Sequence, residues 1–387
     1  MLNYDLTDEQ QILRKNVRGF AEAVIKPKAH DLDESESFSV EITQQMAELG
    51  LFGMFVSEEY GGTEMGYVAY IIAVEELARV DGSQAATVAA GNSLGIGPIY
   101  YFGNDEQKKE WLPRLCATEA EDFRLAAFGL TEPNAGSDAG GSKTNAILEN
   151  GTWLINGSKI FITNSTNPLA GVTIVQAITG KRDSGKKEYS CILVPNGTEG
   201  FRPTTMHGKL MWRASDTGEL FFDDCRVPEQ NLLGDRGTGF HQMLQTLDGG
   251  RLSIAAMGLG CAQGAYEAAL RYAGERVQFG KPISKNQAVA FKLADMAVEI
   301  EAARNMLYKA CWLKEQHRSY EQLAAMCKLY CSEVARRVVH SAVQIHGGYG
   351  LMKEYDVERF YRDQRLLEIG EGTSEIQRLV ISRHIGC

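Results

Sequence analysis

The stretch GEGTSEIQRL, residues 370–379, places one carboxylate, Glu371, between two glycines and just before an expected helix. Ser374 and Gln377 have the spacing of a capping box, in which side chains satisfy the free N–H groups at a helix start. A carboxylate near a helix N-terminus often does no more than complement the helix dipole. Buried beside an acidic C–H bond, the same group could act as a general base, because burial raises the pKa of a carboxylate. The residues alone leave both interpretations open.

The stretch GLTEPNAGSD, residues 129–138, combines glycines with the hydroxyl side chains of Thr131 and Ser137. Small residues let backbone N–H groups approach a flat or anionic ligand closely. The same residue types also form ordinary turns, which is the alternative interpretation. The stretch matches neither the GxGxxG pattern of dinucleotide-binding folds nor the GxxxxGK[ST] pattern of P-loops, so a nicotinamide or nucleoside triphosphate site is unsupported.

Three further stretches could meet an anionic ligand. QIHGGYG, residues 344–350, ends a predicted helix, and its glycines could either cap that helix or leave backbone amides free for a diphosphate. RVQFGKPI begins with Arg276, and an arginine can bind a diphosphate through two parallel hydrogen bonds. LDGGR ends with Arg251, which could pair with Asp248 or meet the polar part of a ligand. None of these stretches decides the function by itself.

The elements that must position these stretches are helical in the first and last thirds of the chain. Thr7 and Gln10 have capping-box spacing, and the helix that they begin is expected to end at Pro27. Further helices are predicted over about 40–50, 67–80, 84–102, 286–316, 320–346 and 373–385, with a short amphipathic one over EQKKEWLPRL.

Short β-rich runs separated by turns fill the middle third. Three AsnGly pairs, at 150–151, 156–157 and 196–197, are typical of turns between strands. We expect an α+β chain of three domains, with a small antiparallel sheet or barrel between two helical parts. The predicted domains are an N-terminal helical domain over 1–122, a middle β domain over 123–233 and a C-terminal helical bundle over 234–387.

The composition limits the class of protein. The chain has 387 residues, 44% of them hydrophobic, and a formal net charge of −10. An acidic balance argues against a nucleic-acid surface, which needs clustered lysine and arginine. The eight cysteines form no CxxC pair and the seven histidines no HExxH motif, so neither a disulfide framework nor a metal site is predicted. The isolated cysteines favour reduced core thiols in a cytosol-like compartment. We find no secretory signal and no apolar stretch long enough to cross a bilayer.

The order and spacing of these stretches resemble the acyl-CoA dehydrogenase family from about Tyr4 to the C-terminus. The family's two diagnostic stretches are both present, as GLTEPNAGSD and as QIHGGYGLMKEYDVERFYRD. INGSKIFITN matches the middle domain, and the ending EGTSEIQRLVISRHI, with QTLDGGR and FKLADMA, resembles the short-chain or butyryl-CoA branch. The resemblance implies a flavoprotein that binds FAD and oxidises an acyl-CoA thioester.

The resemblance also implies a role for each matching position, and Glu371 matches the catalytic base. The positions that match FAD contacts near the ring system are Phe128, Leu130, Thr131, Ser137, Phe161, Thr163, Thr373 and Glu375. Those that match contacts to the FAD diphosphate and adenosine across a subunit boundary are Arg276, Gln287, Gln344, Gly347 and Gly348. Those that match acyl-CoA contacts are Ser137, Asp248, Arg251 and Gly372.

By the same resemblance, Glu371 takes the α-proton of the thioester while the β-hydrogen leaves as hydride to flavin N5, which gives a trans-2-enoyl-CoA. A flavin ribityl hydroxyl and the Glu371 backbone N–H are expected to hold the thioester carbonyl, where one such donor is worth about 3–4 kcal/mol. Some relatives carry the base immediately before the arginine that matches Arg251. That place is Gly250 here, which cannot act as a base, so Glu371 is the expected base.

The segment SQAATVAAGNSLGIG, residues 83–97, matches the floor of the acyl pocket and contains no lysine or arginine. Glutaryl-CoA relatives have an arginine at the position of Ala85, so a dicarboxylic substrate is not expected. Gly91 stands where the short-chain branch has a bulkier polar residue, and the run of small residues could leave space for a branched or alicyclic acyl group. The alternative is that these residues only permit close helix packing.

Two alternatives to a dehydrogenase are an acyl-CoA oxidase, which passes its electrons to oxygen, and a non-catalytic relative that binds DNA or a protein. The retained Glu371 and the net acidity count against the second alternative. The resemblance further implies electron-transferring flavoprotein as the electron acceptor and a homotetramer as the assembly. The expected location is the bacterial cytoplasm, or the mitochondrial matrix if a transit peptide has been removed.

Overall fold

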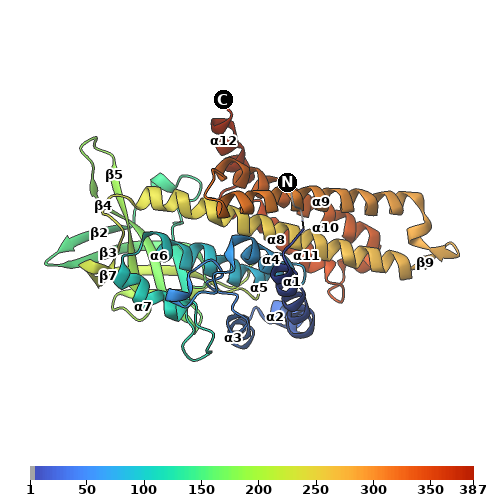
Figure 1. Cartoon of the computed structure of the whole chain (residues 1–387), viewed down its shortest axis with the longest axis horizontal. Coiled ribbons are helices and arrows are strands. Elements are labelled where there is room, and N and C mark those ends of the chain that lie inside the picture. The colour runs from blue at the N-terminus through green and yellow to red at the C-terminus, as the bar shows by residue number, and fades with distance from the viewer. Residues whose placement is uncertain (1–4) are drawn as a thin grey trace.

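The computed structural model describes residues 5–387, so residues 1–4, which the first predicted domain includes, lie outside it. Helices, a sheet and again helices follow one another along the chain, as predicted. Figure 1 shows the large sheet at one end of an elongated molecule, with helices of the two flanking parts packed together. The domain boundaries after residues 122 and 233 stay predictions.

The first part of the chain folds around one enclosed helix. α4 is buried from Tyr67 to its end, and its apolar residues cover all sides, which is typical of a central helix. The predicted helices over 40–50, 67–80, 84–102 and EQKKEWLPRL are confirmed, the third as two helices joined by a π-helical turn. The elements are α1 (Asp8–Phe20), η1 (Ala21–Ile25), α2 (Lys26–Ser35), α3 (Val40–Glu48), η2 (Glu58–Tyr60), α4 (Gly66–Ala78), α5 (Gly82–Ala90), η3 (Gly91–Ile96), α6 (Gly97–Phe102) and α7 (Asp105–Leu115).

The helical segment that begins with α1 continues past Pro27, where the sequence predicted its end. Thr7 and Gln10 form the predicted capping box of α1. Pro27 does not end the path, because the π-helical turn η1 leads directly into α2. Pro27 lies in the first turn of α2, where a missing N–H is tolerated. The expected stop at this proline is therefore wrong.

The middle part forms one open, mixed sheet instead of the expected antiparallel sheet or barrel. Its strand order is β6-β7-β3-β2-β4-β5-β8, and β1 lies beside β4. Both β1 and β2 run parallel to β4. Local turn signals could not reveal these pairs, because parallel neighbours are joined by long connections. The strands are β1 (Leu125–Gly129), β2 (Asn145–Glu149), β3 (Thr152–Thr163), β4 (Ala170–Lys181), β5 (Lys187–Pro195), β6 (Phe201–Thr205), β7 (Thr217–Pro228) and β8 (Leu232–Leu233).

Two of the three AsnGly pairs form turns. Asn150 and Gly151, with φ of 52° and 76°, join β2 to β3 as a tight hairpin requires. Gly197, with φ of 83°, lies in the turn after β5. Gly157 instead lies inside β3 at a shift of register, and a Cβ atom there would lie 2.8 Å from the Thr144 Cα. The close approach of two backbones explains this glycine, and the turn expected at 156–157 is wrong.

Long helices of the last part carry the chain from the sheet to the far end of the molecule. α8 has 37 residues, which gives a length of about 55 Å. It begins at Gly239, packed on Ser190 of β5, and ends before the β9–β10 hairpin, which lies opposite the sheet in Figure 1. The predicted helices over 286–316, 320–346 and 373–385 are confirmed. The elements are α8 (Gly239–Glu275), β9 (Val277–Gln278), β10 (Lys281–Pro282), α9 (Gln287–Glu315), α10 (Glu321–His346), η7 (Gly347–Leu351), α11 (Val357–Leu367) and α12 (Ser374–His384).

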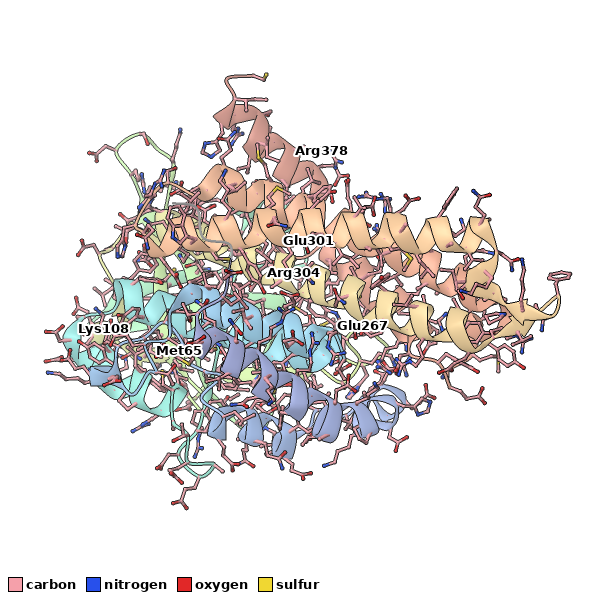
Figure 2. The ribbon with its side chains drawn as sticks, turned by 45° about the vertical axis from the view of Figure 1, so that its right-hand side comes forward. Met65, Lys108, Glu267, Glu301, Arg304 and Arg378 are labelled. Atoms are coloured by element: carbon pink, nitrogen blue, oxygen red, sulfur yellow. The ribbon has the colours of Figure 1, made fainter. Side chains whose placement is uncertain are left out.

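A buried ion pair joins the first and last parts of the chain. Glu75 of α4 is 2% exposed and accepts hydrogen bonds from Arg304 at 2.9 Å and from the Tyr308 hydroxyl at 2.6 Å, both on α9. Arg304 also donates to Gln263 of α8 and pairs with Glu301, which is labelled with it in Figure 2. Because an unpaired buried charge is costly, this network fixes how α4, α8 and α9 pack.

Residues 5–387 contain no disulfide bond, no helix that could span a membrane and no cluster of metal-binding side chains. All cysteines in residues 5–387 have free thiols, and only Cys387 among them is exposed. No helix in that part of the chain has the length and apolarity that a membrane span needs. The described residues also hold no group of three or more histidine, cysteine, aspartate or glutamate side chains that could bind a metal ion.

Candidate active site

Glu371 lies in a strained turn between α11 and α12. Its φ is 52° and that of Gly372 is 96°, so two consecutive residues adopt left-handed conformations. For a residue other than glycine this conformation costs of order 1 kcal/mol or more. Gln377 of α12 is buried, and its Nε2 donates to the Glu371 carbonyl at 3.3 Å and to the Gly372 carbonyl at 3.0 Å. These hydrogen bonds hold the turn that aims the Glu371 side chain.

The predicted capping box of α12 is wrong by one residue. The helix begins at Ser374, and Thr373 is the N-cap, whose hydroxyl accepts the Ile376 N–H at 3.3 Å. The left-handed Gly372 delays the helix start, so Gln377 reaches the turn instead of a capping box. Thr373 and Glu375, two predicted FAD contacts, therefore lie at the beginning of α12.

The Glu371 carboxylate is enclosed without a hydrogen bond to its Oε2 atom from any described residue. That atom is buried, although the residue as a whole is half-buried. It faces Gly250 of α8, and a Cβ atom added to Gly250 would overlap it. Buried polar groups are nearly always hydrogen-bonded, so an unpaired carboxylate oxygen marks a place where a ligand can bind. The two positions that the sequence weighed for a base thus meet at one point in space.

The electrostatic surroundings of Glu371 suit a proton acceptor. Burial raises the pKa of Glu371 to about 7, while the positive charges of Lys328 and Arg251 act in the opposite direction. Burial also raises the pKa of Tyr70, which interacts with the same carboxylate, so its hydroxyl stays neutral. A base acts best when its pKa lies near the working pH. Glu371 can therefore take up a proton and release it again near neutral pH.

Arg251 and Asp248 form a pair next to this carboxylate. Arg251 follows Gly250 on α8 and is 5% exposed. Its Nη1 donates to Asp248 one turn earlier, while its Nε is buried and unpaired within residues 5–387. The pairing that the sequence left open is thus formed and still leaves one donor free. The structure brings Glu371, Gly372, Asp248 and Arg251 together, whereas Ser137 lies exposed in the loop after β1.

A first group of the predicted FAD contacts gathers where β1 ends beside β3. The Ile160 N–H donates to the Thr131 carbonyl at 2.8 Å. The fully buried Lys159 donates to the Leu130 carbonyl at 3.1 Å and pairs with Glu132 at 2.9 Å. This buried pair fixes the backbone of the GLTEPNAGSD stretch. The group consists of Phe128, Leu130 and Thr131 at the end of β1 and of Phe161 and Thr163 in β3.

Phe161 turns its ring out of β3. The pairing of β3 with β7 shifts between Lys159 and Ile162, and Phe161 adopts a φ of 63° at this bulge. Its side chain is consequently 62% exposed. Bulges often re-aim a side chain next to an active site. A large aromatic ring exposed by a strained backbone fits a flat ring system stacked against it.

A second group of predicted FAD contacts lies at the opposite end of α8. The Arg276 guanidinium lies 5.5 Å from the centre of the Tyr349 ring, and so beside the Gly347–Gly348 turn. A Cβ atom added to either glycine would meet nothing within 4 Å, so both backbones are open. This turn, Arg276, Gln344 and Gln287 are all exposed. Figure 1 places the neighbouring β9–β10 hairpin opposite the strands, so one chain does not bring the two groups together.

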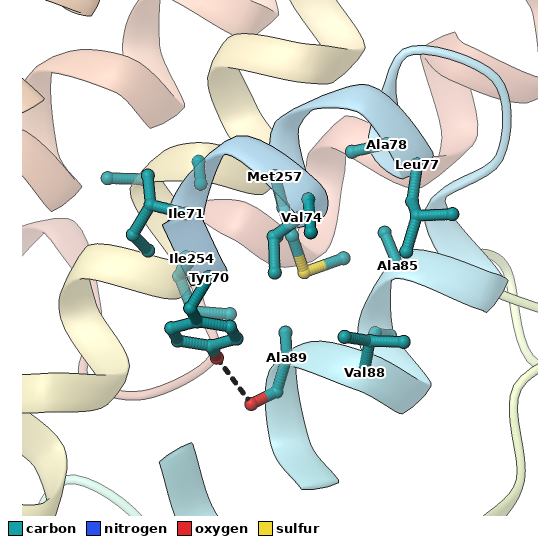
Figure 3. Close-up of a cluster of buried hydrophobic side chains, with 14 of the residues drawn as sticks. Tyr70, Ile71, Val74, Leu77, Ala78, Ala85, Val88, Ala89, Ile254 and Met257 are labelled. Atoms are coloured by element: carbon teal, nitrogen blue, oxygen red, sulfur yellow. Dashed lines mark hydrogen bonds between the residues drawn. The ribbon is translucent and has the colours of Figure 1, made fainter. Parts of the chain in front are cut away.

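The segment predicted to floor the acyl pocket packs into the core between α4 and α8. The Tyr70 hydroxyl donates to the Ala89 carbonyl at 2.8 Å, the bond drawn in Figure 3. Ala85 is fully buried, and the labelled side chains around it in Figure 3 are apolar. The cluster labelled in Figure 3 consists of Tyr70, Ile71, Val74, Leu77, Ala78, Ala85, Val88, Ala89, Ile254 and Met257.

The glycines of η3 serve close packing. A Cβ atom added to Gly91 would lie 2.7 Å from the Phe52 ring. A Cβ atom added to Gly95 would lie 2.6 Å from the Ala126 carbonyl oxygen of β1. Of the two interpretations that the sequence left open, these contacts favour helix packing. The space at Gly91 is filled by Phe52 and does not enlarge a substrate pocket.

Comparison with known proteins decides the family. Models of the N-terminal, middle and C-terminal domains of acyl-CoA dehydrogenases match residues 7–119, 127–225 and 237–386. The chain belongs to the acyl-CoA dehydrogenase family. Acyl-CoA dehydrogenases are oxidoreductases that bind FAD and act on acyl-CoA, so the predicted enzyme class and cofactor are confirmed.

Individual acyl-CoA dehydrogenases are similar over the whole length. The probable acyl-CoA dehydrogenase YngJ of Bacillus subtilis (strain 168) is 50% identical over 384 residues, which cover 99% of this chain and 100% of that protein. Butyryl-CoA dehydrogenase from Megasphaera elsdenii has a TM-score of 0.94 at 41% identity, with 99% and 100% covered. A chain of the solved structure described as electron transferring flavoprotein of Acidaminococcus fermentans has a TM-score of 0.95 at 41% identity, with both chains fully covered.

The site of this acyl-CoA dehydrogenase also includes residues that its motifs did not reveal. Lys328 and Tyr70 interact with the Glu371 carboxylate, and Lys159 fixes the GLTEPNAGSD backbone. A signal for Lys328 was present in the sequence. It takes a place at helical spacing between Ala324 and Cys331, where an apolar residue is expected.

Proposed function

We propose that this acyl-CoA dehydrogenase uses Glu371 as the base that removes the α-proton of a short-chain acyl-CoA thioester, giving a 2-enoyl-CoA. The observation that carries the proposal is the buried, unpaired Oε2 atom facing Gly250. Burial raises the pKa of Glu371 to about 7, which is the range that a base at neutral pH needs.

The residues of the chain divide the work around that proton transfer. Glu371 accepts the proton from the α-carbon, and its backbone N–H donates to the thioester carbonyl, where negative charge develops. Arg251 and Asp248 orient the polar part of the substrate, since Arg251 keeps one buried N–H free. FAD, when bound, supplies the acceptor for the hydride that leaves the β-carbon. The enclosed site excludes water, which keeps the pKa of Glu371 raised.

FAD is proposed to bind across two copies of the chain. The exposed Phe161 ring and the Thr131 backbone would hold its ring system. The open Gly347–Gly348 turn and Arg276 of a second copy would hold its diphosphate, because free amides and an arginine suit phosphate oxygens. A homotetramer provides such pairs of copies. In one chain the Phe161 ring of the first group is exposed, as are Arg276 and the Gly347–Gly348 turn of the second group.

The acyl group is proposed to be short and uncharged. Ala85 lies in a buried apolar cluster, at the position where glutaryl-CoA relatives have an arginine, and Phe52 fills the space at Gly91. The similarity to butyryl-CoA dehydrogenase supports the same class. Anaerobic bleaching of the bound flavin should be fastest with butyryl-CoA in a panel that includes isobutyryl-, hexanoyl- and cyclohexane-carboxyl-CoA. Preference for cyclohexane-carboxyl-CoA would establish an alicyclic acyl group instead.

Electrons are proposed to pass to electron-transferring flavoprotein. The similarity to a chain of the Acidaminococcus fermentans structure supports this acceptor. The alternative of an acyl-CoA oxidase predicts rapid release of hydrogen peroxide in air. We expect reoxidation of the reduced enzyme by oxygen to be slow and its reoxidation by electron-transferring flavoprotein to be fast. Fast peroxide release would establish the oxidase.

A further inference from the structure

Lys328 is a lysine in the buried face of α10. Its side chain is fully buried, and its Nζ donates to the Gly372 carbonyl at 2.6 Å. A buried ammonium group without a compensating partner would cost several kcal/mol. A lysine in this position is therefore retained for an interaction that an apolar residue could not make. Gly372 is the residue immediately after Glu371, so the hydrogen bond from Lys328 restrains the turn that carries Glu371.

The charges around Lys328 come from several elements. Glu371 and Glu368 lie on the segment between α11 and α12, Glu375 lies on α12, and Arg251 approaches from α8. Burial lowers the pKa of Lys328 to about 8, and Glu371 is the largest of the charges that oppose this shift. In return, Lys328 is the largest charge that lowers the pKa of Glu371. The two groups therefore stabilise each other's charged forms.

Lys328 stabilises the charged form of the Glu371 carboxylate without donating a hydrogen bond to its Oε2 atom. Its short hydrogen bond goes to the Gly372 backbone, and the Glu371 Oε2 atom stays unpaired. A direct ion pair would cover the oxygen that has to accept a proton. The same hydrogen bond restrains Gly372 in its left-handed conformation, which follows the strained φ of Glu371. One ammonium group thus acts on both the geometry and the charge of the base.

We propose that Lys328 is a positioning residue for the base, which fixes the turn that aims Glu371 and holds its carboxylate in the charged form. The proposal rests on the role proposed above for Glu371. It differs from a merely structural role, because loss of a structural lysine would lower stability and leave the pH dependence of the reaction unchanged.

The test compares three variants of the flavin-loaded enzyme. Lys328→Met removes the charge and the donor, and Lys328→Arg keeps both. Ser332→Ala is the control, since the Ser332 hydroxyl bonds the Lys328 and Leu367 carbonyls in the same buried helix face without touching Glu371. The readouts are flavin content, thermal midpoint and the pH profile of anaerobic flavin reduction by butyryl-CoA.

Lys328→Met should move the acid limb of that profile upward by about one pH unit, because loss of a nearby cation raises the pKa of a carboxylate. The rate at pH 7 then falls about fivefold, because the deprotonated fraction of Glu371 falls from about one half to about one tenth, and the rate recovers almost fully at pH 9. Lys328→Arg should have its acid limb at the same pH as the wild type. Ser332→Ala should lower only the thermal midpoint. If Lys328→Met does not fold with flavin, Lys328→Gln, which donates without a charge, should show the same shift.

A profile of Lys328→Met, or of Lys328→Gln in its place, that superimposes on the wild type would overturn the proposal. Failure of the proposed function has a different signature. In that case the wild type would bleach with none of the acyl-CoA thioesters, or Glu371→Gln would still bleach. An active wild type and an inactive Glu371→Gln variant, together with an unshifted lysine variant, would reject the role of Lys328 alone.

Discussion

At the scale of single residues, Glu371 depends on the absence of a side chain at Gly250. A Cβ atom at Gly250 would overlap the Glu371 Oε2 atom. We predict that Gly250→Ala displaces the carboxylate and lowers the rate of flavin reduction about 100-fold, since a shift of about 1 Å at a reacting group has that effect. Gly274→Ala on the same helix, where a Cβ atom meets nothing within 4 Å, is the matched control and should keep the rate. Equal rates in both variants would contradict this geometry.

The raised pKa of Glu371 also predicts a cost in stability. Its folded-state pKa of about 7 exceeds the ordinary value of 4.5, so the folded protein loses stability as the pH rises between these values. Glu371→Gln removes this cost, which is at most about 3 kcal/mol. The variant should therefore have a higher thermal midpoint than the wild type at pH 8 and nearly the same midpoint at pH 5. The same difference at both pH values would show that Glu371 is not desolvated.

At this scale the motifs indicated Glu371 together with Asp248 and Arg251, whereas the contacts of Tyr70 and Gln377 with the turn were not predicted. The Glu371 Oε2 atom is buried because the turn between α11 and α12 packs against Gly250 of α8, and this contact between distant segments cannot be deduced from a motif. Gln377 was placed in a capping box because its spacing allows one, while the conformation of Gly372 moves the helix start. Lys328 was within reach of a sequence argument, as a charged residue in an apolar helix face.

At the scale of elements, η3 is packed tightly on its neighbours. We predict that Gly91→Ala pushes the Phe52 ring, which its Cβ atom would approach to 2.7 Å, and destabilises the protein by about 1–3 kcal/mol. The preference among acyl-CoA thioesters should stay unchanged, because this space belongs to the core. Thermal unfolding and the acyl-CoA panel measure the two effects. A changed acyl preference at unchanged stability would show that Gly91 lines the pocket.

Local periodicity predicted where the helices lie, but it did not predict how the strands of the sheet pair. Apolar spacing predicts α9 and α10 to within one residue of their observed ends. The parallel pairing of β1 with β4 depends on contacts between distant segments, which turn residues cannot indicate. The ends predicted at Pro27 and Gly157 were wrong because residues that usually end an element can also lie inside one. Pro27 follows a π-helical turn in the first turn of α2, and Gly157 lies at a shift of register inside β3.

At the scale of the whole molecule, the two groups of predicted FAD contacts lie toward opposite ends of α8. We predict that Arg276→Ala and Phe161→Ala each lower FAD affinity, the arginine variant about 30-fold through loss of a charge-assisted hydrogen bond pair. Subunits of the two variants refolded together should form some sites with both groups intact. Flavin content and activity should then return to about a quarter of wild type. Mixed subunits that stay as inactive as the separate variants would contradict a shared site.

The role of Glu371 is tested most directly by rapid anaerobic mixing of butyryl-CoA with flavin-loaded wild type and Glu371→Gln. The flavin absorbance records the reaction in a single turnover. The wild type should bleach at a rate that rises with pH through about 7, because Glu371 must lose its proton to act. Glu371→Gln should bind the thioester and bleach about 100- to 10,000-fold more slowly at every pH. Bleaching of Glu371→Gln at the wild-type rate would show that another group removes the α-proton.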